Sequence, residues 1–308
     1  MSADGIALPP AMRVFERGWL SSNNILFAGP GPTTLVDTGY LLHAEQTLAL
    51  VARALEGRPL ERIVNTHLHS DHCGGNAALQ ARYGCHTTIP VHEADRVAAW
   101  DEDALSFRAT GQRCARFGFD ATLCAGDTLA LGGMTWDVLA APGHDPHSLI
   151  FHCAAEDILI SADALWEHGF GVIIPELEGQ SGFAEQRAVL SLIDTLDVRV
   201  VIPGHGAPFT GVKGALGRAF SRLDYLAADP LRNAENAVKV MLKFLLLERQ
   251  QLPLASLPAL FEQNPVIDGA RRRFLGKSTS ELAEWTVRSL VRAGAAKIDG
   301  ELLVNYEL

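Results

Sequence analysis

The chain has 308 residues, of which 48% are hydrophobic and 20% are charged. This composition suits a globular protein with a sizeable core and excludes global disorder. The formal net charge is −10, and the acidic excess lies in residues 1–210, because residues 211–308 carry a small positive excess. An acidic surface repels nucleic-acid phosphates, so the charge disfavours general nucleic-acid binding.

Neither a secretory signal nor a membrane span is expected. Residues 1–13 lack a basic segment followed by an apolar core. No uncharged apolar stretch reaches the roughly 18 residues that a membrane helix needs. The five cysteines are odd in number and form no C-x-x-C pair, which fits reduced thiols better than a disulfide framework. We therefore expect a cytoplasmic protein.

Along residues 1–210, predicted strands and helices follow one another. Short apolar segments rich in β-branched residues predict buried strands. These segments are Thr33–Asp37, Arg62–Thr66, Thr135–Ala140, Asp157–Ser161 and Arg199–Pro203. Helical patterns cover Leu42–Leu55, Gly75–Tyr83, Val91–Trp100 and Phe183–Leu196. Mixed elements in this order predict a layered α/β architecture.

After Pro208 the pattern becomes mainly helical. Lys213–Ala227 and Asn233–Gln250 predict helices, and the second carries an apolar stripe. A further helix is expected from Ser278 to about Ala293, and an Asp-Gly turn then joins two short strands as a hairpin. Helices followed by a hairpin resemble a winged-helix module. We expect a catalytic domain over residues 1–210 and a helical, winged-helix-like domain over residues 211–308.

Residues of metal-ligand type follow the predicted strands. Asp37 ends the first strand of this set, and His67 and His69 follow the second. The remaining three strands are followed by His144, Asp163 and His205, in that order. Sites in open α/β sheets lie at strand ends, where loops converge while the sheet holds them rigid. The sequence therefore predicts that these side chains meet.

The segment Thr66–His72 is the strongest local signal. His67 and His69 are two residues apart in an extended segment, so both side chains point the same way. Asp71 and His72 then enter the next helix and can face a second ion. Imidazoles and carboxylates suit zinc, and they also accept iron or manganese.

The chain resembles the metallo-β-lactamase-fold superfamily over roughly residues 15–210. The resemblance lies in five motifs in the family's order: Leu35–Gly39, Thr66–His72, Pro142–His144, Ser161–Asp163 and Pro203–Gly206. It implies an αββα sandwich with two divalent metal ions at one edge of the paired sheets. It further implies that His67, His69 and His144 hold the first ion and that Asp71, His72 and His205 hold the second. Asp163 would bridge both ions, and Asp37 would fix ligands through hydrogen bonds.

The implied chemistry is hydrolysis by a hydroxide that bridges the two metal ions. Two dications lower the pKa of a shared water enough to give a hydroxide near neutral pH. Asp71 is the predicted catalytic residue, which orients this oxygen or accepts its proton. Three residues are weaker candidates for contacting substrate: His147, Trp166 and His168. Surface solvation is the alternative for His147, and core or loop packing is the alternative for the other two.

The identity of Asp163 narrows the class of hydrolase. Within the resembling family, Asp at this position is typical of glyoxalase II-like thioesterases, lactonases, nucleases and related hydrolases, whereas antibiotic-degrading members generally carry Cys or Ser. We therefore expect a small ester or thioester substrate, as in hydroxyacylglutathione hydrolases or lactonases, and no main role in β-lactam hydrolysis.

Two other functions remain open at this point. In an RNA-cleaving metallo-nuclease, the basic residues Arg271–Arg273 and Lys277 would contact phosphates. In a regulatory protein, the metal site would be kept with little turnover. The C-terminal domain could be a lid, a contact in a homo-oligomer or a nucleic-acid binder, and no membrane partner is expected.

Overall fold

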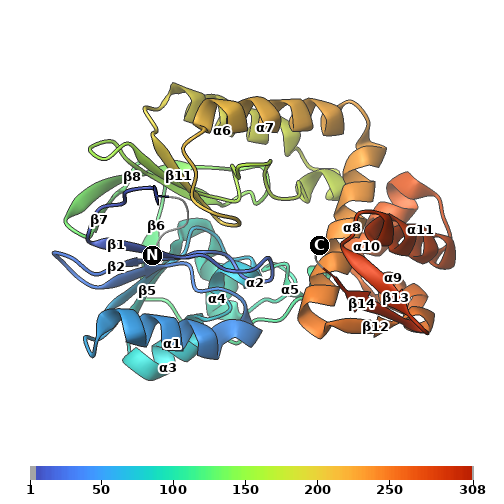
Figure 1. Ribbon diagram of the computed structural model, residues 1–308, viewed down its shortest axis with the longest axis horizontal. Helices are drawn as coiled ribbons and strands as arrows, with labels where there is room; N and C mark the ends of the chain where they lie inside the picture. The colour runs from blue at the N-terminus through green and yellow to red at the C-terminus, as the bar shows by residue number, and fades with distance from the viewer. Residues whose placement is uncertain (1–4, 307–308) are drawn as a thin grey trace.

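The structure is a computed structural model that describes residues 5–306. Two β-sheets pack face to face with helices on both outer faces, and a helical region with a small third sheet lies beside them (Figure 1). In the described part of the chain, no helix is both long and apolar enough to cross a membrane.

The first sheet has six strands in sequence order. They are β1 (Met12–Phe15), β2 (Asn24–Phe27), β3 (Thr34–Val36), β4 (Arg62–Val64), β5 (His86–Pro90) and β6 (Ala121–Leu123). β1, β2 and β3 pair antiparallel, while β3 to β6 pair parallel. Parallel strands run in one direction, so the loops that follow β3 and β4 leave the sheet at the same edge.

The second sheet has five strands. In spatial order they are β11 (Val200–Pro203), β10 (Ile158–Ala162), β9 (Leu149–Cys153), β8 (Met134–Ala140) and β7 (Thr128–Leu131). β10 and β11 are parallel, and the other neighbours are antiparallel. The loops after β10 and β11 therefore also leave at a common edge.

The core between the sheets is apolar because alternate residues of each strand face inward. Phe27 and Val36 from the first sheet pack with Trp136, Val138 and Phe151 from the second. Leu35, next to Val36, lies instead in the core formed with the helices on the outer face. The two faces of each sheet are thus buried in different cores.

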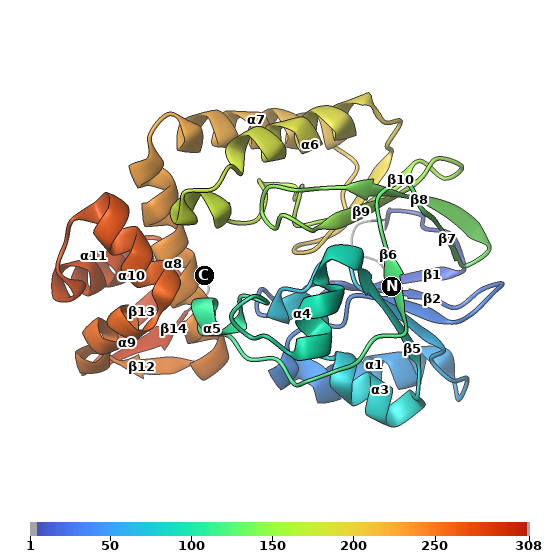
Figure 2. The same ribbon diagram turned by 180° about the vertical axis from the view of Figure 1, so that it is seen from behind.

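Helices cover both outer faces of this pair of sheets, as Figure 2 shows from behind. α1 (Ala44–Leu55) and α3 (Asn76–Tyr83) pack on the first sheet, and α6 (Phe183–Thr195) and α7 (Val212–Ala227) pack on the second. Three short helices lie in the connections: α2 (Ser70–Cys73), α4 (Ala94–Ala99) and α5 (Phe107–Thr110). The αββα sandwich predicted from the sequence is confirmed.

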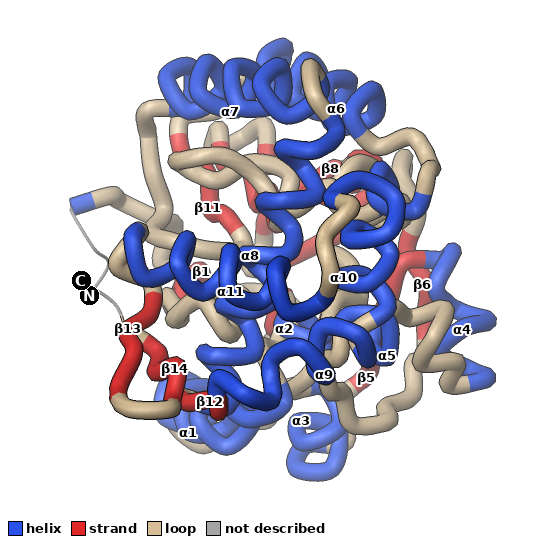
Figure 3. The backbone as a smooth tube through the Cα atoms, turned by 90° about the vertical axis from the view of Figure 1, so that its right-hand side faces the viewer, coloured by secondary structure: helices blue, strands red, loops and turns tan. Residues whose placement is uncertain are grey.

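The region after α7 has its own apolar core. Its helices are α8 (Pro230–Arg249), α9 (Leu257–Gln263), α10 (Pro265–Ala270) and α11 (Thr279–Arg292). Its sheet has the order β12 (Gln251–Pro253), β14 (Leu302–Asn305) and β13 (Ala296–Asp299). Figure 3 shows these elements together in front of the sandwich. The mainly helical C-terminal region is confirmed, while its winged-helix description and the domain boundary at residue 210 stay predictions.

A buried carboxylate ties α8 to the sandwich. Glu248 accepts hydrogen bonds from the Tyr40 hydroxyl (3.1 Å) and from Arg113 Nε (2.7 Å). The Tyr40 ring also packs edge-on against Phe244 of α8, with ring centroids 5.4 Å apart. Burial and the neighbouring Glu248 carboxylate raise the pKa of Tyr40 to about 12, so its hydroxyl remains a donor at neutral pH.

Removing this carboxylate should destabilise the protein. In Glu248→Ala the buried Tyr40 hydroxyl loses its acceptor, and we expect the free energy of unfolding in urea to fall by about 1–3 kcal/mol. The control is Glu284→Ala, which removes an exposed i,i+4 pair with Arg288 and should cost about 0.5 kcal/mol or less. Equal losses in the two variants would contradict a specific role for the Glu248 contacts.

Candidate metal centre

The predicted metal ligands lie together in two adjacent clusters inside the molecule. The loop after β4 and the short helix α2 carry four of them, and the loops after β8, β10 and β11 carry one each. The three-histidine cluster consists of His67, His69 and His144. The mixed cluster consists of Asp71, His72, Asp163 and His205. Within each cluster the candidate ligand atoms lie within 4.8 Å of one another.

In the three-histidine cluster, ring nitrogens face each other at short range. His69 Nδ1 lies 2.8 Å from His144 Nε2 and 3.2 Å from His67 Nε2. Burial lowers the pKa of His67 well below its usual value and lowers that of His69 to about 4. Both rings are therefore neutral at pH 7, and a cation between their lone pairs would bind them together.

His144 is held in one tautomer by the backbone. Its Nδ1 lies 2.6 Å from the Val172 carbonyl oxygen, to which it donates a hydrogen bond. Nε2 is then the acceptor nitrogen, and it points into the cluster. Fixing a ligand histidine through its other ring nitrogen is common in metal sites, because it orients the ring.

In the mixed cluster, His72 has a buried nitrogen without a partner. Its Nδ1 donates to Asp37 Oδ2 at 2.7 Å, so Nε2 is the ring nitrogen left for a metal ion. Burial lowers the pKa of His72, but the carboxylates of Asp163 and Asp37 raise it well above its usual value. Nε2 is buried and has no hydrogen-bond partner, and it lies 3.4 Å from Asp163 Oδ1. A buried ring nitrogen without a hydrogen-bond partner is unfavourable, whereas a cation that displaces its proton would satisfy it. The donor set therefore fits a divalent metal ion.

Asp163 lies between the two clusters. Its Oδ1 faces His72 in the mixed cluster, and its Oδ2 lies 3.4 Å from His144 Nε2 in the three-histidine cluster. Burial alone would raise its pKa, but the neighbouring His72, His205 and His144 lower it well below the usual value. The group is therefore a carboxylate with one oxygen directed to each cluster.

Asp37 organises the ligand loop. It directly follows β3 and has a positive φ of 54°. Its carboxylate accepts hydrogen bonds from the Thr66 backbone N–H (2.9 Å) and hydroxyl (2.7 Å), in addition to the one from His72. The role of Asp37 in fixing ligands stays a prediction that is consistent with this arrangement. The motif Thr66–His72 is thus attached to the end of β3 as well as to β4.

The glycine before His205 allows the loops after β10 and β11 to approach closely. A Cβ atom on Gly204 would overlap Asp163 Oδ1, and it would lie 3.0 Å from the His72 ring. Only glycine leaves room for the Asp163 carboxylate at this point. The Pro-Gly-His sequence therefore has a steric reason, independent of any ligand role of His205.

The three predicted substrate contacts are not brought together. Trp166 lines a cavity next to the clusters, and its indole N–H donates to Asp163 Oδ1 at 3.2 Å. His147 lies beside His92 and 3.9 Å from Glu93, and the side chain of His168 is 78% exposed. Neither histidine lines the cavity. The substrate role of these residues stays a prediction.

Two further residues contact the clusters without having been predicted. Trp19 stacks on His205, with ring centroids 5.4 Å apart and an angle of 7° between the planes. Asp145 Oδ2 lies 3.6 Å from His69 Nε2, the nitrogen that faces away from the cluster. Asp145 directly follows the predicted ligand His144, so its position in the sequence could have indicated a contact with the clusters. Nothing in the local sequence around Trp19 indicates its contact.

Comparisons with known proteins agree with this geometry. The family model described as the metallo-beta-lactamase superfamily matches residues 17–205, and the chain belongs to this superfamily. The chain is 25% identical over 175 residues to a hydroxyacylglutathione hydrolase of Rhizobium etli, covering 57% of each chain. It is 30% identical over 147 residues to one of Hyphomonas neptunium, covering 46% of each. The matches thus span about half the length of these relatives.

Other matches, in sequence and in structure, cover a larger share of the similar protein. An uncharacterised protein of Mycobacterium leprae is 30% identical over 208 residues, which are 62% of this chain and 89% of that protein. A metallo-beta-lactamase family protein from Thermus thermophilus has a similar structure, with a TM-score of 0.58 and 19% identity over 97% of this chain and 100% of its own. A beta-lactamase domain protein from Burkholderia ambifaria has a TM-score of 0.57 and 20% identity, and the match covers 100% of this chain and 95% of that one. These structures support the fold.

Metal analysis should find two divalent ions per chain, and ligand variants should lose them. We expect His67→Ala and His72→Ala to lower the metal content of protein purified without chelator, because each removes a donor from a different cluster. The control His86→Ala alters an exposed histidine at the start of β5 that belongs to neither cluster, and it should keep the full content. Full occupancy in both ligand variants would disprove the assignment.

The steric role of Gly204 can be tested separately. Gly204→Ala should displace Asp163 and reduce metal affinity at least tenfold in competition with a chromogenic chelator. Gly217→Ala in α7 adds a methyl group where nothing lies within 4 Å, and it should bind metal normally. Unchanged affinity in Gly204→Ala would show that the loops can separate without cost.

Proposed function

We propose that the chain is a metal-dependent hydrolase that holds two divalent ions and cleaves a small ester or thioester. The observation that carries the proposal is the pair of clusters joined by Asp163, whose two carboxylate oxygens face different sets of histidines. Zinc is the metal that the donor set favours, and iron or manganese also fit imidazole and carboxylate ligands.

In this proposal the protein positions the reacting groups and accepts a proton from the attacking water. Two divalent ions, when bound, supply Lewis acidity for a carbonyl and lower the pKa of water. Asp71 lines the cavity, and its Oδ2 lies 3.1 Å from His205 Nε2. Burial would raise the pKa of Asp71, but the hydrogen bond from His205 and the charge of nearby histidines lower it. Asp71 is therefore a carboxylate at neutral pH and can accept a proton from attacking water.

The thioester or ester class rests on the relatives and on Asp163. Hydroxyacylglutathione hydrolases align with the part of the chain that carries the clusters. Since the alignment covers only about half of those proteins, it supports the reaction class and leaves the thiol or alcohol part of the substrate open. The cytoplasmic location and a possible homo-oligomer stay predictions.

The contacts of the C-terminal arginines disfavour RNA cleavage. Arg271 and Arg272 both pair with Asp268, at 2.7 and 2.8 Å, and Arg273 donates to the Leu177 carbonyl oxygen at 2.9 Å. These contacts hold the three guanidinium groups to the protein, so some would have to break for all three to bind a phosphate backbone, although one carboxylate offsets only one of the three charges. The alternative of a regulatory protein with little turnover has no supporting observation among the described residues.

Removal and return of metal provide the functional test. Dialysis against a chelator should abolish hydrolysis of the best substrate in a panel of thioesters, lactones, aryl esters, a β-lactam and an RNA oligonucleotide. Returning two equivalents of zinc, manganese or iron should restore the rate. We expect a thioester, lactone or ester to be cleaved fastest. A metal-loaded protein that cleaves only RNA, or nothing in the panel, would refute the proposal.

A further inference from the structure

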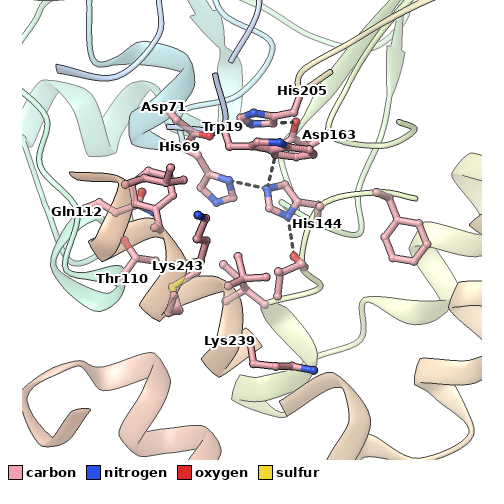
Figure 4. A pocket seen from close by; sticks show the side chains of 18 of the residues that line it. Trp19, His69, Asp71, Thr110, Gln112, His144, Asp163, His205, Lys239 and Lys243 are labelled. Atoms are coloured by element: carbon pink, nitrogen blue, oxygen red, sulfur yellow. Dashed lines mark hydrogen bonds and ion pairs between the residues drawn. The ribbon is translucent and has the colours of Figure 1, made fainter. Parts of the chain in front are cut away.

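The cavity beside the candidate metal centre continues well beyond the ligands. It has a volume of about 350 Å³, within the range of small-molecule sites. Figure 4 shows His69, His144 and His205 at one end of this cavity and Lys239 of α8 at the other. The cavity is thus shared by the catalytic sandwich and the C-terminal region.

The wall away from the ligands is apolar. It is formed by the segment that follows Asp163 and by the C-terminal helices α8 and α11. Its apolar residues are Phe170, Val172, Ile174, Val240, Met241, Phe244, Leu247 and Leu290. On α8, Val240, Phe244 and Leu247 are four and three residues apart, and Met241 lies three before Phe244, so all four lie along one face of the helix.

Part of this apolar face of α8 remains open to solvent. Val240 is 37% exposed, and Phe244 and Leu247 are half-buried, although Leu242, Leu245 and Leu246 on the same helix are buried in the core. Apolar side chains around a cavity that reaches the metal ligands can be covered by an apolar group of a bound molecule.

The charges around the cavity restrict the kind of molecule that can bind in it. Three cations line it: Arg222, Lys239 and Lys243. The only carboxylates among the lining residues are the predicted ligands Asp71 and Asp163. A positively charged substrate group would therefore be repelled, while an uncharged apolar chain meets aliphatic and aromatic side chains along most of the wall.

We propose that the wall formed by α8 receives the acyl chain of the substrate, so that the protein prefers thioesters or esters of medium-length apolar carboxylic acids. This inference rests on the proposed function. The carbonyl carbon would lie at the metal centre, with the chain extending along α8. Water adds its oxygen to the acyl carbon, the carbon–sulfur or carbon–oxygen bond breaks, and a proton from the water passes to the departing thiolate or alkoxide. The products are the carboxylic acid and the thiol or alcohol.

A series of straight-chain thioesters of one thiol, from two to ten carbon atoms, tests the inference with the metal-loaded full chain. Each added methylene should raise kcat/KM roughly two- to fourfold until the cavity is filled. A flat or falling series with measurable acetyl thioester cleavage would overturn the acyl assignment and leave the proposed function intact. No cleavage of any thioester or ester would instead count against the proposed function.

A binding measurement tests the cavity without relying on turnover. Trp19 and Trp166 both line it, so their fluorescence should respond to straight-chain carboxylates. We expect decanoate to bind at least tenfold more tightly than butyrate. Equal affinities, or no binding of either, would overturn the inference.

A filled cavity should remove the preference for long chains. In Leu247→Trp the larger ring occupies the wall, and the ratio of kcat/KM for the decanoyl and acetyl thioesters should fall at least tenfold. The matched control Leu231→Trp alters an exposed leucine of the same helix that does not line the cavity, and it should keep the ratio. Should Leu247→Trp misfold, Val240→Asp places a carboxylate at a position that is partly exposed, and it should lower the same ratio. An unchanged ratio in a folded variant would overturn the inference.

Discussion

Burial of many ligand-type groups at one point is the constraint on which the rest of this structure depends. Histidine nitrogens lie 2.8–3.2 Å apart in one cluster, and two carboxylates approach the histidines of the other. Lone pairs and charges held this close are unfavourable without a compensating cation. Repulsion between these groups favours their separation, so the packing around them must hold them in place. The sandwich and the C-terminal region both contribute to that packing.

The sandwich contributes by fixing where each ligand loop begins. β3 and β4 are adjacent parallel strands, and Asp37 at the end of one binds Thr66 just beyond the end of the other. β10 and β11 are likewise adjacent and parallel, and Gly204 lets the loops after them approach within van der Waals contact. The ligands therefore come from loops that are short and anchored at their origin. Such an arrangement limits how far the donors can move apart when no ion is bound.

Much of this centre could be predicted from the sequence because its signals are local. The segment from Thr66 to His72 combines residues of metal-ligand type with a defined spacing, and it directly follows a predicted strand. The separation of the helices predicted over Lys213–Ala227 and Asn233–Gln250 also has a local cause: Asp229 caps α8 by accepting from the Leu231 N–H, and Pro230 starts the helix.

Other features could not be predicted, because they depend on contacts between distant segments. Trp19 stacks on His205 across 186 positions of the chain, and no spacing rule connects the two. The Glu248 contacts with Tyr40 and Arg113 are of the same kind. The strand β12 was missed because Gln251–Pro253 has no apolar run: only Leu252 is buried, and proline is uncommon within strands. Side-chain placement around the cavity depends on how α8 is rotated, which periodicity alone does not fix relative to the sandwich.

The position of α8 links the stability of the C-terminal region to the metal centre. Asn233 of α8 donates to the Ile173 carbonyl oxygen at 3.0 Å, and the neighbouring Val172 carbonyl accepts from His144 Nδ1. Val172 itself belongs to the apolar core of the C-terminal region. The segment that fixes the tautomer of His144 is therefore held by α8 on one side and by His144, a predicted metal ligand, on the other. Because the same helix also forms the apolar wall of the cavity, a shift of α8 would change the shape of that wall and the orientation of His144 together.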